Sequence, residues 1–243
     1  MSLLRSARST PQVSAVSRDD PTTWRPMAFS PREAKHIRNA VCEPLWAGRR
    51  AMAHVDRGQV TIRDEEAAEV DGFEDLRVAL AGANLAVDLV VDGYLIPGTL
   101  RSNPTSAEVP GSESMVTPGQ LTRQMFLGGG GSNKRREALE RAEARRVALP
   151  PDGPTTFVAI DLLRLDGQHL LDVPLLERRR LLESALQEAD HVRRSVAVRP
   201  PVEAWYAQWK TLGILEIAVK DANSRYRPGD VSEDWATAPI PRR

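Results

Sequence analysis

The pattern of hydrophobic and polar positions along the chain predicts short strands interleaved with helices. Residues 51–55 and 59–63 flank the turn Asp56-Arg57-Gly58, which predicts a β-hairpin. Further apolar runs predict strands over residues 86–91, 157–163 and 214–219. Helical patterns predict helices over residues 73–80, 134–149, 175–189 and 201–209. In the helix over residues 175–189, five leucines are expected to face one core.

These elements interleave without a regular strand–helix–strand rhythm, and no internal repeat is present. We therefore expect an α+β fold with antiparallel or mixed sheets flanked by helices. Residues 1–30 are rich in Ser, Arg, Thr and Pro, which predicts a disordered N-terminal tail. One domain is expected over residues 31–239, with an insertion of loop and charged helix over about 102–149 and a short tail at 240–243.

Composition narrows the class of protein. The 243 residues carry 33 basic and 33 acidic side chains, and this zero net charge argues against a surface devoted to duplex DNA, although it allows a local basic patch. The one cysteine rules out an intramolecular disulfide and favours a reducing, cytoplasmic location. No apolar run is long enough to span a membrane, and the N-terminus lacks the apolar core of a signal peptide.

Four motifs follow one another in a specific order between about residues 40 and 239. They are Glu43-Pro44-Leu45-Trp46-Ala47-Gly48-Arg49-Arg50-Ala51, Val91-Asp92-Gly93-Tyr94-Leu95-Ile96, the pair 160–167 and 175–182, and Tyr226-Arg227-Pro228-Gly229 with Asp234-Trp235 after it. Together they resemble the motifs of ATP-dependent DNA ligases, most closely the short bacterial enzymes of double-strand-break end joining. The resemblance implies the ligase-type nucleotidyltransferase (adenylation) domain, ATP-grasp-like, with a cleft between its sheets and with ATP and Mg²⁺ as cofactors.

Several positions depart from the family motifs. The family's nucleophilic lysine is Leu45 here, and a leucine has no nitrogen lone pair with which to attack ATP. The family aspartate two residues later is Ala47, the glutamate of the metal–nucleotide site is Tyr94, and the aromatic residue that stacks on adenine is Ile160. The glutamate of the E-G-x-V-x-K strand is Leu215 in the ungapped register, and both lysines of the final W-x-K-x-K motif are absent after Trp235.

Two cations at family nucleotide-pocket positions remain, namely Arg50 and Lys220. The resemblance implies that they contact a nucleotide, and the alternative is that they are structural remnants. Lys35, ten residues before Leu45, is the candidate for a substitute nucleophile. The chain also ends where the family's oligonucleotide-binding-fold domain would begin, so we expect that domain to be absent.

The other reactive residues favour structural roles. The four histidines lack the spacing of metal ligands, so surface or turn positions are expected for His36, His54, His169 and His191. Cys42 is expected to be a small core residue. The run 128–134 lacks the P-loop pattern and is interpreted as a linker, while the charged helix after it is the best candidate for contact with a DNA backbone. Trp205, Tyr206 and Trp209 are expected in a core or interface.

The leading hypothesis is a non-catalytic ligase-like protein that keeps the fold and has a binding or regulatory role near DNA or DNA-repair proteins. One alternative is an active ligase that uses a non-standard lysine or a domain supplied by a partner. The other is a protein interaction module unconnected with ATP or DNA.

Overall fold

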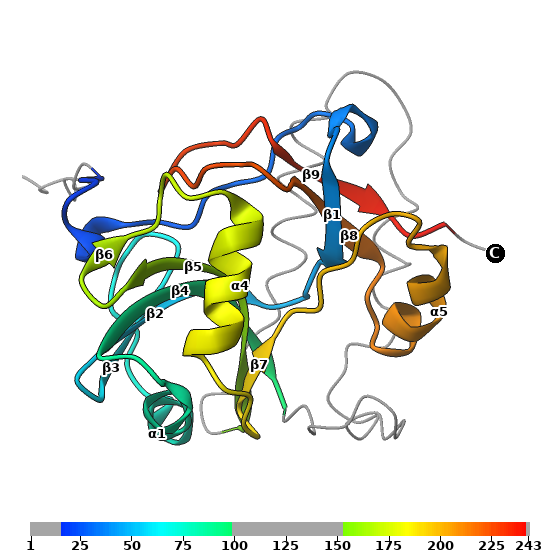
Figure 1. Ribbon diagram of the computed structural model, residues 1–243. Coiled ribbons are helices and arrows are strands. Elements are labelled where there is room, and N and C mark those ends of the chain that lie inside the picture. Colours follow the sequence, from blue (N-terminus) through cyan, green and yellow to red (C-terminus); the bar gives the residue numbers. More distant parts are fainter. Residues whose placement is uncertain (1–15, 99–152, 242–243) are drawn as a thin grey trace, which may run out of the picture.

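A computed structural model describes residues 16–98 and 153–241. In these residues nine strands, three α-helices and two 3-10 helices follow one another along the chain (Figure 1). Their bounds are η1 Pro21–Thr23, η2 Ala34–His36, β1 Ala40–Pro44, β2 Arg49–Asp56, β3 Gln59–Arg63, α1 Glu74–Ala83, β4 Asp88–Pro97, β5 Thr155–Leu165, β6 Gln168–His169, α4 Leu175–Ala185, β7 Val192–Arg194, α5 Glu203–Thr211, β8 Glu216–Asp221 and β9 Trp235–Pro239. The expected α+β fold is confirmed.

The larger sheet has six strands in the order β3-β2-β4-β5-β6, and β7 pairs parallel with β5. The predicted hairpin forms β2 and β3, because Arg57 and Gly58 adopt positive φ angles of 48° and 81° in the tight turn between them. The long central pair β4–β5 is buried over most of its length, which explains its continuous apolar run.

Helices α1 and α4 cover one face of this sheet (Figure 1). Leu76 and Leu80 from α1, with Leu182 from α4, pack on alternate residues of β2 such as Ala51 and Ala53. The period of 3.6 in the helices and of two in the strand therefore meet in one core.

The smaller sheet is antiparallel in the order β1-β8-β9, and α5 packs beside it (Figure 1). Strand β9 was not among the predicted elements. It forms because Ala218 pairs with Thr237 and Lys220 with Trp235, which are partners distant along the chain.

Two of the sequence predictions about tails need correction. Residues 16–30 were expected to be disordered, yet Trp24 and Met27 are 0% and 1% exposed and Ser30 donates its N–H to the carbonyl of Trp235 at 2.7 Å. At the other end Ile240 is buried and donates its N–H to the carbonyl of Leu215 at 2.8 Å. Apolar side chains in both segments therefore find partners in the body of the domain.

Smaller differences concern the ends of elements. Helix α4 ends at Ala185 rather than at residue 189, and it begins without a side-chain cap because Pro174 occupies its N-cap position. The predicted loop 102–119, linker 128–134 and helix 134–149 lie outside the described residues. None of the described helices is long and apolar enough to cross a membrane.

Candidate functional site

The position of the family nucleophile lies in the connection between β1 and β2. Leu45 is 5% exposed, and its N–H donates to the carbonyl of Glu216 at 3.0 Å, which ties this connection to the smaller sheet. Gly48 follows where the chain passes close to β4, and a Cβ atom there would lie 2.3 Å from the carbonyl oxygen of Leu95. The turn that presents Leu45 is therefore held against both sheets.

Leu45 belongs to a buried apolar cluster, here named the Leu45 cluster. Its members come from both sheets, from α5 and from adjoining segments: Cys42, Leu45, Trp46, Tyr94, Ile96, Val158, Ile160, Val202, Trp209, Ile214, Ile217, Ala218, Val219 and Ile240. Three of them, Leu45, Tyr94 and Ile160, occupy motif positions that had lost the family residue. These substitutions thus meet in one apolar core between the sheets.

Arg50 is buried beside this cluster and its guanidinium is held by the chain itself. Its Nε and Nη2 donate to the two carboxylate oxygens of Asp92 at 2.6 Å each, and its Nη1 donates to the hydroxyl of Tyr94 at 2.9 Å. The hydroxyl of Tyr226 also donates to Asp92 at 2.6 Å, and it accepts the N–H of Met27 at 2.8 Å. Although burial opposes its charge, the neighbouring Asp92 raises the pKa of Arg50.

Lys220 is held in a second internal pair. It is 1% exposed, its Nζ contacts a carboxylate oxygen of Glu43, and it lies 4.0 Å from the centre of the Trp235 ring. The other carboxylate oxygen of Glu43 accepts a bond of 2.9 Å from Arg179, which also donates to the carbonyls of Ile160 and Ser195. Burial lowers the pKa of Lys220, while Glu43 acts in the opposite direction.

A third buried pair ties α4 to the larger sheet. Arg178 donates to both carboxylate oxygens of Asp161 at 2.8 and 2.7 Å, and both side chains are 0% exposed. Arg178 also donates to the carbonyl of Ser224 at 3.0 Å. Each of the three pairs therefore holds a buried carboxylate against a buried cation.

The remaining predicted site residues lie apart from this arrangement or serve the core. Lys35 is exposed on η2 and pairs with Glu33 at 2.5 Å. Cys42 is buried, as expected, and burial raises its pKa to about 11. Trp209 is in the core, and the ring of Trp205 stacks on it with the two ring centroids 6.1 Å apart. His54 lies within β2 rather than in a turn, and burial lowers its pKa to about 4.

The residues present do not fit ATP with Mg²⁺. Arg50 is paired with Asp92, Lys220 shares Glu43 with Arg179, and Tyr94 places a phenol where the family has a metal-binding acid. No group of three or more His, Cys, Asp or Glu side chains suited to a metal occurs in residues 16–98 and 153–241. The side chains that meet at this site therefore make a packed, charge-paired core rather than a triphosphate pocket.

Comparisons with known proteins agree with the motifs. Residues 131–237 match the family described as the ATP dependent DNA ligase domain. The chain is 31% identical over 90 residues to DNA ligase 2 of Methanosarcina acetivorans, covering 34% of this chain and 16% of that one. It is 30% identical over 183 residues to a DNA ligase of Thermococcus fumicolans, covering 69% of this chain and 32% of that one. The crystal structure of the ligase domain of M. tuberculosis LigD superposes with a TM-score of 0.61 at 22% identity, covering 90% of this chain and 60% of that one.

The chain is related to the adenylation domain of ATP-dependent DNA ligases. Its fold is that of the LigD ligase domain. It spans only 16–32% of the length of the two curated ligases just described, so the activity of those whole proteins does not pass to it directly.

Sequence reasoning missed the partners of Arg50. Asp92 and Tyr226 both lie in the ligase-like motifs, but they were quoted there only as parts of a matching pattern. The cross-strand register provides the missing signal, because Arg50 pairs with Tyr94 and Met52 with Asp92, which brings these side chains onto one face.

Proposed function

We propose that this ligase-like chain is non-catalytic and has a binding or regulatory role in DNA repair. The observation that carries the proposal is the Leu45 cluster, in which the positions of the nucleophile, the metal-site acid and the adenine-stacking aromatic are packed together as Leu45, Tyr94 and Ile160. Burial of these apolar groups is favourable by about 1.5–3 kcal/mol for each large side chain, and ATP would have to displace that packing.

The chemistry of the first ligase step also supports a non-catalytic chain. Adenylyl transfer forms a bond between an amine nitrogen and the α-phosphorus of ATP, and pyrophosphate leaves. Leu45 has no nitrogen, and Lys35 is exposed on η2 and paired with Glu33. The buried amine of Lys220 contacts Glu43, which disfavours its release as a free nucleophile.

The test is the intact mass of the protein after incubation with ATP and Mg²⁺, with an active ATP-dependent ligase as the positive control. We expect an unchanged mass for the wild type and for Lys35→Ala. An AMP adduct on the wild type would contradict the proposal, and loss of that adduct in Lys35→Ala would identify the substitute nucleophile.

A second variant, Leu45→Lys, distinguishes two reasons for an absence of adenylylation, which are the lack of a nucleophile and the packing of side chains where ATP would bind. We expect no adduct here either, because Tyr94 and Ile160 remain and the new ammonium enters an apolar cluster. Leu45→Met is the matched control for packing, and it should change the free energy of unfolding by less than about 1.5 kcal/mol. An adduct on Leu45→Lys would mean that ATP enters the cleft, and that the chain lacks only its nucleophile.

A further inference from the structure

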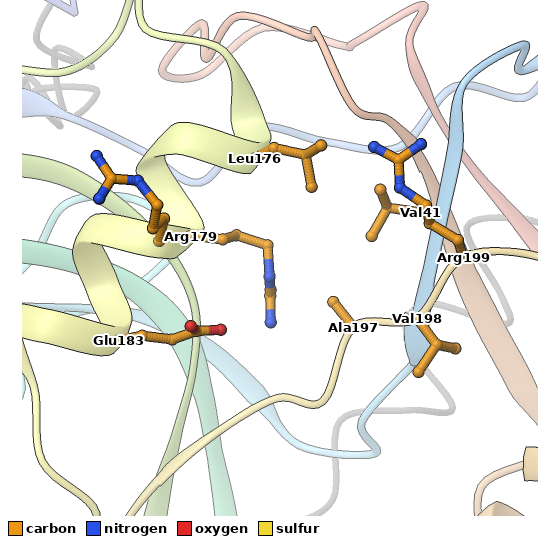
Figure 2. Close-up of a pocket in the computed structure, with 8 residues that line it drawn as sticks. Val41, Leu176, Arg179, Glu183, Ala197, Val198 and Arg199 are labelled. Atoms are coloured by element: carbon orange, nitrogen blue, oxygen red, sulfur yellow. The ribbon is translucent and has the colours of Figure 1, made fainter.

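A groove separate from the substituted motif positions lies between α4 and the segment that joins β7 to α5 (Figure 2). Its volume is about 280 Å³. Figure 2 shows Leu176, Arg179 and Glu183 on the α4 wall, with Ala197 and Arg199 on the opposite wall. The substituted positions Leu45, Tyr94 and Ile160 do not line it.

One wall of the groove is the segment that bridges to β1 at Val198. The N–H and carbonyl of Val198 exchange two hydrogen bonds of 2.8 Å with Cys42, which makes an isolated antiparallel bridge beside β1. In an antiparallel pair the residues on either side direct their N–H and carbonyl groups away from the partner strand. Within the described residues, the backbone groups of Ala197 and Arg199 form no hydrogen bond, so this edge can pair with another extended chain.

The charges in the groove favour one class of partner. Arg179 is paired with Glu43 and Arg180 with Glu177, whereas Arg199 is exposed and forms no ion pair with any described residue. A nucleic-acid backbone is bound by several cations at once, but Arg179 is buried with Glu43, Arg180 shares an exposed pair with Glu177, and the groove also carries Glu183. A single carboxylate on a peptide would pair with Arg199.

The apolar part of the lining completes the match. Val41, Leu176 and Val198 lie between the charged positions, and this volume accepts one or two aliphatic side chains. Backbone pairing along the edge would supply affinity, and the apolar and charged contacts would supply selectivity.

We propose that this groove binds an extended, acidic peptide segment of a partner protein, which adds a strand beside residues 197–199 and places a carboxylate on Arg199. The inference goes beyond the loss of catalysis and does not depend on it, because an adenylylated chain would present the same groove.

The probe is a fluorescein-labelled peptide of eight residues in which valine and threonine alternate around one central glutamate, titrated with the full chain by fluorescence anisotropy. We expect saturable binding below about 1 mM, weakened at least about tenfold by Arg199→Glu, because like charges then face each other. A peptide with lysine at its centre should bind Arg199→Glu better than it binds the wild type. Hydrogen exchange at the amides of Ala197 and Arg199 should slow when the acidic peptide is bound.

The backbone pairing between peptide and protein is tested by changing the peptide, so the result does not depend on whether a protein variant folds. Peptides methylated on odd or on even backbone nitrogens should differ, because only one set of N–H groups faces the protein edge. No binding by the wild type at 1 mM, equal binding of the two methylated peptides, or no effect of charge reversal would each overturn the proposal. Binding of an oligonucleotide, lost in Arg199→Glu, without binding of the peptide would assign the groove to nucleic acid and overturn it too.

Discussion

At the scale of single residues, neighbouring arginines on β2 illustrate how burial decides what a charge contributes. Arg50 and Asp92 are almost fully buried and share two hydrogen bonds, whereas the side chain of Arg49 is 38% exposed and pairs with Asp64 at 2.8 Å. Removing one partner of a buried pair leaves the other charge uncompensated in a medium of low dielectric. The same substitution therefore has different consequences at adjacent positions.

We expect Arg50→Met to lower the free energy of unfolding by about 3–5 kcal/mol, and Arg49→Met to lower it by no more than about 1 kcal/mol. Urea unfolding of both variants measures the difference. Equal losses would mean that the Arg50–Asp92 pair does not hold the site together as its geometry indicates.

His54 provides a dependence of stability on pH. Its pKa is lowered from 6.5 to about 4, first by burial and then by Arg63 and Arg164. Between these values the unfolded chain takes up a proton that the folded chain does not, so the free energy of unfolding falls as the pH falls from 6.5 towards 4. The loss from this group reaches up to about 3 kcal/mol below pH 4.

We expect His54→Gln to lose less stability than the wild type between pH 7 and pH 4.5, because the variant has no imidazole to titrate in the unfolded state. Urea unfolding at both pH values gives the comparison, and His36→Gln on exposed η2 is the control. If His54→Gln and the wild type lost the same free energy, the acid sensitivity would have to come from other groups.

At the scale of elements, the close approach of the β1–β2 connection to β4 leaves no room for a side chain at one glycine, whereas a glycine on α1 has open space around it. A Cβ on Gly48 would lie 2.3 Å from the carbonyl oxygen of Leu95 and 2.7 Å from Cγ2 of Ile96, whereas Gly82 on α1 has nothing within 4 Å of an added Cβ. We expect Gly48→Ala to destabilise the fold by at least about 1–3 kcal/mol, as other overpacked sites are. Gly82→Ala should stabilise it by about 0.5–1 kcal/mol.

Thermal unfolding of the two alanine variants measures this contrast. A neutral Gly48→Ala would show that the β1–β2 connection moves away from β4 at little cost, and the packing of Leu45 would then be less constrained than it is here.

Elements with a local signal were predictable and those with a distant partner were not. The β2–β3 hairpin follows from Asp56-Arg57-Gly58, and helix α4 follows from its helical period. The expectation that its five leucines face one core was wrong, because Leu176 lines the groove and Leu175 packs in a different cluster from Leu182. Strand β9 has no such signal, since its sequence Trp-Ala-Thr-Ala-Pro becomes a strand only through pairing with β8. The same distinction applies to the surroundings of Arg50. The replacement of the family glutamate by Tyr94 is visible in the sequence, but the hydrogen bonds of Arg50 to Asp92 and Tyr94 depend on the register between β2 and β4.

At the scale of the whole molecule, residues 16–30 join the two sheets, although their composition predicted a tail. Trp24 and Met27 pack with Met52 and Leu163 of the larger sheet, and with Trp235 of the smaller one. Ala28 also exchanges backbone hydrogen bonds with Asp230 and Ser232, both of 2.9 Å. Composition misled the prediction here because two large side chains among many polar ones are enough to anchor a short segment.

The anchoring is tested by Trp24→Ala, which removes a fully buried indole and the hydrogen bond of 2.9 Å from its Nε1 to the carbonyl of Ser17. We expect a loss of about 3–5 kcal/mol in the free energy of unfolding. Val231→Ala, at a residue that is 61% exposed and bridges to Ala28, should stay within about 0.5 kcal/mol of the wild type. Because Trp24 shares a buried apolar cluster with Tyr226, which bonds to Asp92, Trp24→Ala should also make Arg50→Met less costly in the double variant. Strict additivity of the two losses would show that the N-terminal segment stabilises the sheets independently of the Arg50–Asp92 pair.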